Sequence, residues 1–168
     1  MQVFKTKTGL INVLISLLIV VMVALMFVPS IDYAKKEDTY ETSVYGYVFM
    51  LTEKPWRYMT DYIEDGLADD ILGEGAGENY SVNDCFGEPM LILLLGVTFI
   101  VICFYGYKHW FPTITNVIWG IIGIVGATSN PIMKMSGLQT VYLILPIAVI
   151  VLALLNGALT TVLKKKEA

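Results

Sequence analysis

Four long apolar runs constrain the fold of this chain more than any other feature of its sequence. They cover about residues 9–29, 89–108, 112–130 and 139–163, and no Asp, Glu, Lys, Arg or His lies in the interior of any run. A helix of about 20 apolar residues crosses the hydrocarbon core of a bilayer, which is roughly 30 Å thick. Only 15% of the residues are charged, whereas about 25% is usual in soluble domains. The sequence therefore predicts an all-α integral membrane protein, in which residues 1–168 form a single bundle of four transmembrane helices.

The first run has an alternative interpretation as a cleaved secretory signal. Its apolar part, Leu10–Val28, is longer than the roughly 7–15 residues that are usual in such signals. We therefore expect the first run to stay in the protein as an uncleaved span.

Residues 30–88, which we name the acidic segment, separate the first run from the second. The segment holds fourteen of the fifteen acidic residues but only four of the eleven basic residues. The stretch Val44–Leu51 is apolar but too short to cross a membrane, so it is either a strand or a helix at the lipid surface. Further along, apolar residues recur every three or four positions, which indicates a short amphipathic helix: Trp56, Met59, Ile63, Leu67 and Ile71. We expect the acidic segment to be a loop subdomain with one or two such helices.

The distribution of lysines predicts which way the bundle faces. Four spans place both termini on the same side, and six lysines then lie on that side: Lys5, Lys7, Lys108, Lys164, Lys165 and Lys166. Because Lys and Arg are enriched in short cytoplasmic tails and turns, both termini are predicted to be cytoplasmic. The acidic segment then lies outside the cell, and the protein lies in the plasma membrane. A re-entrant third run is the alternative, but it would place the three C-terminal lysines outside.

The third run is rich in small residues at helical spacing: Gly120, Gly123, Gly126 and Ala127. Small residues let helices approach closely in lipid. We therefore predict that these residues form a helix-packing face and that the third run is the most enclosed of the four. In the fourth run, Pro146 should bend the helix.

Several residues invite a chemical interpretation, but each has a simpler one. The cluster Asp61, Glu64, Asp65, Asp69, Asp70 and Glu74 has oxygen ligands for a divalent cation, yet it lacks the spacing of a calcium-binding loop. The only histidine, His109, would need a nearby carboxylate to act as a general base, and the nearest acidic residues by sequence lie across a span. We therefore expect a solvated acidic surface and an interfacial anchor, with no metal site, no cofactor and no enzymatic activity.

The two cysteines and the asparagines of the apolar runs also have expected roles. Cys85 is a lone thiol in the acidic segment, either free or paired with another molecule, whereas Cys103 lies mid-span as a small apolar filler. Asn12, Asn116 and Asn156 are suited to hydrogen bonds between helices. Coupled transporters depend on charged residues within their spans, so coupled transport is not expected here.

Aromatic residues beside the acidic cluster are the candidate partner-facing group: Trp56, Tyr58 and Tyr62, with Asp61 and Asp65. Tyr and Trp are enriched at the centres of interfaces. The alternative is that these rings form a small core within the loop and rest on lipid headgroups.

We therefore expect a small multi-pass membrane protein that acts as a non-catalytic scaffold or accessory subunit. It would dock a membrane protein partner, or another copy of itself as a homo-oligomer, through the outer loop and the third span. A small oligomeric channel or permease is the alternative. Membrane lipid is an expected partner and nucleic acid is not, because the basic residues are few and divided by the membrane. The four-span (tetraspan) layout resembles claudin-type proteins in outline, but the paired loop cysteines and tryptophan motif of that family are missing.

Overall fold

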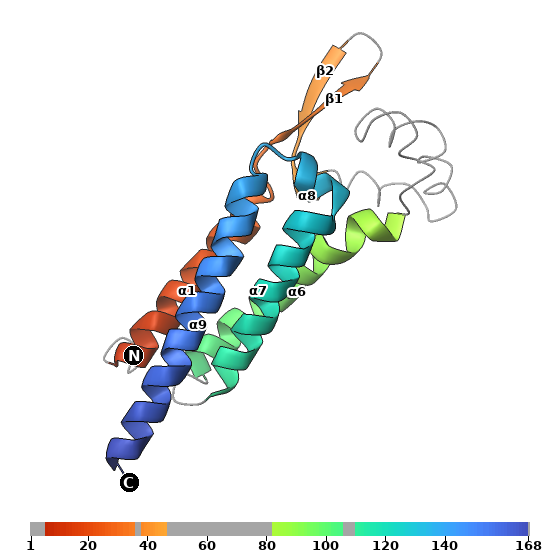
Figure 1. The fold of residues 1–168 in the computed structure, drawn as a ribbon. Helices are drawn as coiled ribbons and strands as arrows, with labels where there is room; N and C mark the ends of the chain where they lie inside the picture. The colour runs from red at the N-terminus through yellow and green to blue at the C-terminus, as the bar shows by residue number, and fades with distance from the viewer. Residues whose placement is uncertain (1–5, 36–37, 47–81, 106–109, 168) are drawn as a thin grey trace.

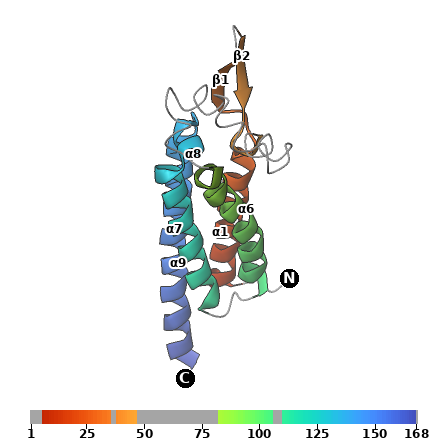
Figure 2. The same ribbon diagram turned by 90° about the vertical axis from the view of Figure 1, so that its right-hand side faces the viewer.

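Four long helices form the body of the protein. The computed structural model describes residues 6–35, 38–46, 82–105 and 110–167. The long helices are α1 (Lys7–Leu25), α6 (Val82–Tyr105), α7 (Phe111–Ser129) and α9 (Gln139–Glu167). Each contains a stretch that is long and apolar enough to cross a membrane, which confirms the prediction of four such helices. They pack in a ring in the order α1, α6, α7 and α9, with both termini at the same end (Figures 1 and 2).

The helix ends differ from the predicted boundaries. The side-chain oxygen of Thr6 accepts a hydrogen bond from the backbone N–H of Gly9 at 3.1 Å, which caps the start of α1. This helix ends at Leu25 rather than at Pro29, whereas α9 continues past Leu163 to Glu167. α6 begins at Val82, so Pro89 lies inside the helix and not at its start, where the predicted second run begins. A proline removes a single backbone hydrogen bond, and the first turns of α6 lean away from the bundle (Figure 1).

A β-hairpin follows α1, and it was not predicted from the sequence. Strands β1 (Ile31–Lys35) and β2 (Asp38–Thr42) pair antiparallel, with Tyr33 opposite Tyr40 in the register. The hairpin projects beyond the bundle at the end opposite the termini (Figure 1). We name these the hairpin end and the terminal end. The tyrosines and threonines of the strands favour extended backbone, but charged residues between them obscure this signal in the sequence.

The rest of the acidic segment is described only in part. Residues 44–46 form a helical turn, which is the beginning of the predicted strand or surface helix at Val44–Leu51. The predicted amphipathic helix from Trp56 to Ile71 lies outside the described residues.

A short helix that was not predicted from the sequence connects α7 to α9 at the hairpin end. This helix, α8, covers Pro131–Met135. The side-chain oxygen of Asn130 accepts a hydrogen bond from the backbone N–H of Met133 at 3.1 Å, and Pro131 occupies the first helical position. An asparagine cap followed by proline is a strong start signal for a helix.

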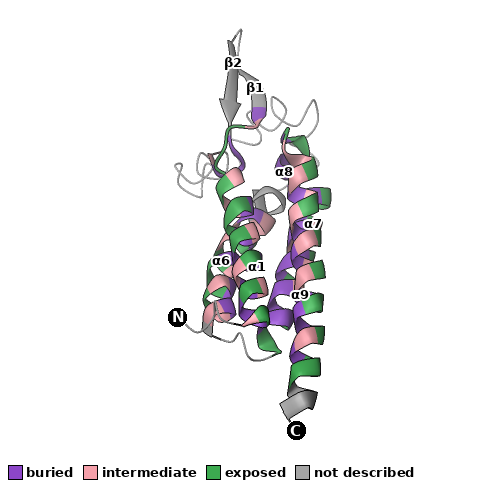
Figure 3. Cartoon of the chain, turned by 90° about the vertical axis from the view of Figure 1, so that its left-hand side faces the viewer, coloured by how far each residue is buried: buried purple, intermediate pink, exposed green. Residues whose placement is uncertain are grey.

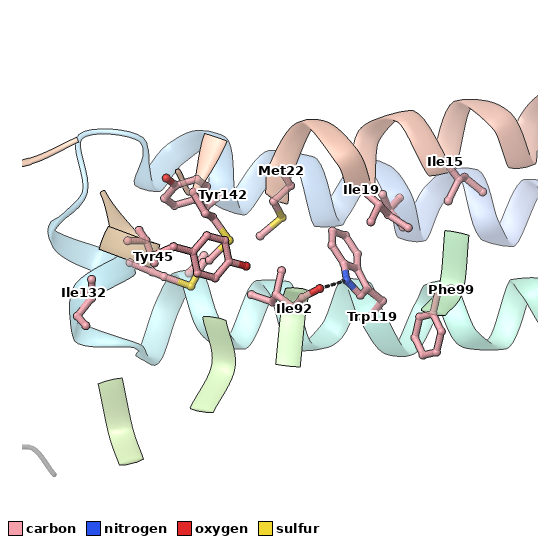
Figure 4. Close-up of a cluster of buried hydrophobic side chains, with 14 of the residues drawn as sticks. Ile15, Ile19, Met22, Tyr45, Ile92, Phe99, Trp119, Ile132 and Tyr142 are labelled. Atoms are coloured by element: carbon pink, nitrogen blue, oxygen red, sulfur yellow. Dashed lines mark hydrogen bonds between the residues drawn. The ribbon is translucent and has the colours of Figure 1, made fainter. Parts of the chain in front are cut away.

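Buried residues extend along the length of the bundle (Figure 3). Ile15, Ile19 and Met22 of α1 are fully buried in a cluster with Trp119 of α7 (Figure 4). The indole N–H of Trp119 donates to the carbonyl oxygen of Ile92 at 3.0 Å, so the one polar atom of this ring is satisfied. The outward faces carry exposed apolar side chains on every long helix, for example Leu94, which is 59% exposed. Contiguous apolar surface of this extent would be covered by lipid in a membrane.

The predicted small-residue face of α7 packs within the same chain. A Cβ atom added at Gly120 would collide with Ile150, and one added at Gly123 would lie 2.7 Å from Cγ of Pro146. Both glycines therefore let α9 approach α7 closely, with the ring of Pro146 against Gly123. The third span is also the most enclosed of the four, as predicted, since half of it is buried inside the structure.

We predict that Gly123→Ala lowers the free energy of unfolding by about 1–3 kcal/mol, because the methyl group must displace Pro146. Gly87→Ala is the matched control, since a Cβ atom there meets nothing within 4 Å. The control should gain up to about 1 kcal/mol from helix propensity alone. Denaturant unfolding of both variants in detergent measures the difference. Equal effects of the two substitutions would contradict close packing at Gly123.

Candidate functional site

The first residues of the acidic segment are fixed to the connection between α8 and α9. The hydroxyl oxygens of Ser30 and Ser136 lie 2.7 Å apart in a hydrogen bond. The backbone N–H of Gly137 donates to the carbonyl oxygen of Ser30 at 2.8 Å. Residues that are more than one hundred positions apart in the sequence are therefore joined at the point where the segment leaves α1.

Tyr45 anchors the segment a second time, in the interior of the hairpin end. Its side chain is fully buried and its ring centroid lies 4.5 Å from that of Phe27. The backbone N–H donates to the carbonyl oxygen of Met26 at 3.0 Å, and the hydroxyl donates to the carbonyl oxygen of Pro89 at 3.0 Å. Burial raises the pKa of the Tyr45 hydroxyl above its ordinary value of 10.0, and the nearby Tyr142 raises it further. Tyr45 therefore joins α1 to α6 as a neutral phenol.

The last residue of the acidic segment, Glu88, is held by the same connection. A carboxylate oxygen of Glu88 accepts a hydrogen bond from the side-chain amide of Asn130 at 3.2 Å, while Asn130 also caps α8. Gly126 provides the space for this contact, because a Cβ atom there would lie 3.3 Å from Cβ of Glu88. Both ends of the acidic segment thus meet residues 130–137, and we name this set of contacts the anchoring layer.

Two side chains near the start of α9 complete the hairpin end. The hydroxyl of Tyr142 donates to the carbonyl oxygen of Leu25 at 3.1 Å. The side-chain amide of Gln139 donates to the carbonyl oxygen of Ala127 at 3.3 Å. The carbonyl of Ala127 belongs to the last turn of α7, where no intrahelical donor follows, whereas that of Leu25 also accepts a hydrogen bond from the backbone N–H of Val28 at 3.0 Å. α9 therefore bonds to the ends of both of its neighbours.

A second polar cluster lies near the terminal end of the bundle. The side-chain amide N–H of Asn156 on α9 donates to Oδ1 of Asn12 on α1 at 2.7 Å. The amide N–H of Asn12 donates to the carbonyl oxygen of Cys103 on α6 at 3.4 Å, and that of Asn116 on α7 donates to Sγ of Cys103 at 3.1 Å. These four residues, which we name the asparagine layer, join all four long helices. The prediction that the asparagines bond between helices is confirmed.

The asparagine layer corrects the role predicted for Cys103. The thiol is free and fully buried, as a small filler would be, but its sulfur is a hydrogen-bond acceptor of Asn116. Sulfur is a weak acceptor. The spacing of residues along the sequence does not indicate which polar group a buried cysteine contacts.

The remaining predicted site residues are placed as follows. Gly120, Gly123, Gly126 and Ala127 all lie on the buried face of α7. The partner-facing candidates Trp56, Tyr58, Asp61, Tyr62 and Asp65 lie outside the described residues, as do the acidic cluster and His109. Within the described part of the chain, no three His, Cys, Asp or Glu side chains come together in a way that would hold a metal ion. The backbone of Cys85 belongs to the first turn of α6.

Comparison of the chain with models of protein families, with curated proteins and with solved structures finds no match. No family is assigned to it.

The anchoring layer is the part of the site that sequence reasoning missed. In the sequence, Ser30, Tyr45, Ser136 and Glu88 look like ordinary loop or boundary residues, because contacts between distant positions leave no local pattern. One signal was available, namely the pair Asn130-Pro131, which predicts a capped helix start.

We predict that Tyr45→Phe lowers the free energy of unfolding by about 1 kcal/mol below pH 10, through loss of the hydrogen bond to Pro89. In the native state burial keeps the phenol protonated, whereas in the unfolded state it ionises near its ordinary pKa of 10.0. The unfolded state therefore loses this proton first, and the contribution of Tyr45 to stability decreases as pH rises above 10. Unfolding of both proteins between pH 8 and about 11 measures the gap between them. A gap that stays constant or widens above pH 10 would contradict a buried, protonated Tyr45.

Proposed function

We propose that this protein is a non-catalytic membrane scaffold or accessory subunit, in which the four-helix bundle presents the acidic segment to a partner. The observation that carries the proposal is the anchoring layer, where the beginning and the end of the acidic segment are both bonded to residues 130–137. A loop that merely connects two spans needs no such attachment. Fixed ends lower the conformational entropy that the segment would lose on binding, and they hold its two ends at a defined separation.

The interior of the bundle supports a structural role over a transport role. Fully buried side chains extend from Ile15 near the terminal end, past Trp119, to Tyr45 at the hairpin end (Figure 4). Charged residues that would carry an ion through the spans are missing from the interior of all four apolar runs. A pore lined by the glycine face of α7 would need that face to be open, and in this structure α9 covers it.

The outward side of α7 is the part of the third span that is open to a neighbouring helix. Ile114, Ile118 and Ile121 are each about half exposed, on the side opposite to Gly120 and Gly123. We therefore propose that docking through the third span uses this apolar side, together with the acidic segment above it. The partner would be another membrane protein or a second copy of this chain.

The proposal includes a direction in the membrane. α8, with the exposed Lys134, lies at the hairpin end, whereas α1 begins and α9 ends at the terminal end (Figure 1). The sequence places six of the eleven basic residues near the terminal end and the acidic residues near the other. By the positive-inside tendency the terminal end is cytoplasmic and the acidic segment is outside, in the plasma membrane.

The direction is tested by thiol labelling in intact cells. With Cys103→Ser, Cys85 is the only cysteine of the chain, and a membrane-impermeant maleimide should label it before the cells are opened. The control carries Cys85→Ser, Cys103→Ser and Lys165→Cys, and should be labelled only after the cells are opened. The reverse pattern in the two proteins would show that the termini are outside.

The scaffold role is tested by replacing residues 47–81 with a Gly/Ser linker of equal length, which leaves the anchoring layer intact. We expect the thermal unfolding temperature to stay within a few degrees, while the assembly formed in native membranes, measured by native gel electrophoresis, is lost. Scrambling residues 47–81 at constant composition gives the control for charge alone. Two results would contradict the proposal: an unchanged assembly, or ion or solute flux into liposomes that contain only this protein.

A further inference from the structure

The asparagine layer and the adjoining Thr113 contain three buried oxygen atoms that have no hydrogen-bond partner in the described part of the chain: Oγ1 of Thr113, Oδ1 of Asn116 and Oδ1 of Asn156. The three residues are 3%, 0% and 2% exposed. A buried polar atom without a partner is destabilising, so these three oxygens indicate a bound group that forms hydrogen bonds with them.

Thr113 and Asn116 belong to α7 and Asn156 belongs to α9, and the two helices meet at this level. Thr113 and Asn116 lie three positions apart on α7, which places them on the same side of that helix. A Cβ atom added at Gly157 would lie 3.2 Å from Oγ1 of Thr113. Gly157 follows Asn156 directly on α9, so the layer closes between α7 and α9 with small residues at the contact.

Rotating the asparagine amides does not remove the unpaired atoms. In the layer, Asn156 donates to Oδ1 of Asn12, and Asn12 donates in turn to the carbonyl oxygen of Cys103. Turning Asn12 would place its oxygen against that carbonyl, so the orientations of Asn12 and Asn156 are fixed. Turning Asn116 would let its oxygen accept from the thiol of Cys103, but its amide N–H groups would then lack a partner.

We propose that the asparagine layer, together with Thr113, binds one internal water molecule. Water has two hydrogens to donate, and the layer offers two amide oxygens that need a donor. The hydroxyl of Thr113 donates in turn to the water oxygen, which gives the water three hydrogen bonds, the usual number for a buried water. The water thereby bridges α7 to α9 at a level where direct side-chain bonds connect α9 to α1 and α7 to α6.

A monovalent cation is the alternative occupant of a site built from oxygens, and it fits less well. Three neutral oxygens cannot replace the hydration shell of an ion, and the apolar runs that form the layer contain no carboxylate to neutralise it. Water needs no counter-charge. The layer therefore connects the four helices near the terminal end through neutral side chains and one bound water.

The test is solid-state NMR of the full-length protein in liposomes, with ¹⁵N-labelled asparagine and tryptophan. The rate of magnetisation transfer from water protons to the side-chain amides of Asn116 and Asn156 is measured. The indole N–H of Trp119 is the internal reference, because it lies one turn from Asn116 on α7 and is bonded to the carbonyl of Ile92. We expect transfer to both amides to be several-fold faster than transfer to Trp119. Transfer as slow as at Trp119 would overturn the proposal.

Two further measurements distinguish one bound water from general wetting and from a bound cation. Thr113→Val removes one partner of the water and should slow the transfer to Asn116 several-fold. Thr115→Val is the matched control, because the hydroxyl of Thr115 bonds only to carbonyls of its own helix, those of Phe111 and Pro112, and it should leave the transfer unchanged. Equal effects of the two variants would indicate general wetting of the terminal end and would overturn the proposal. Signals that shift when sodium replaces choline in the buffer would identify a cation as the occupant, with the same consequence.

Discussion

The close contact between α7 and α9 is the interaction on which the rest of the structure depends. Gly120 and Gly123 let the two helices approach until α9 meets α7 through Pro146 and Ile150. In the membrane that we propose for this protein, helices gain nothing from burying apolar surface against one another, so close packing of small residues would hold them together. The contact between α7 and α9 fixes residues 130–137, which connect the two helices at the hairpin end. That connection in turn holds both ends of the acidic segment.

Polar side chains are used sparingly and at two levels. Near the hairpin end, the hydroxyls of Tyr45 and Tyr142 donate to the backbone carbonyls of Pro89 and Leu25. Near the terminal end, amide groups join the four helices through the asparagine layer. Between these levels the core is apolar and is centred on Trp119. Apolar packing alone would permit the helices to slide along one another, and the polar side chains at both levels fix their register.

This arrangement is what the proposed scaffold role requires. The apolar core leaves the spans without a charged group, while the anchoring layer ties the acidic segment to the most enclosed helix through α8. The α7–α9 contact is therefore linked to the acidic segment through the connection at residues 130–137.

Hydrophobicity and the distribution of charge, which are local properties of the chain, determined by themselves the number of long helices, their approximate positions and the acidity of the segment between the first two. Small residues on α7 indicated its enclosed face, because helical spacing places Gly120 and Gly123 together whatever they contact. Only the tertiary structure decided that α9 covers that face, that Cys103 accepts a bond from Asn116, and that Ser30 meets Ser136. It also decided where α6 begins, since Pro89 removes one hydrogen bond without ending the helix. Such contacts join residues from distant parts of the chain, and no periodic pattern records which distant residues will meet.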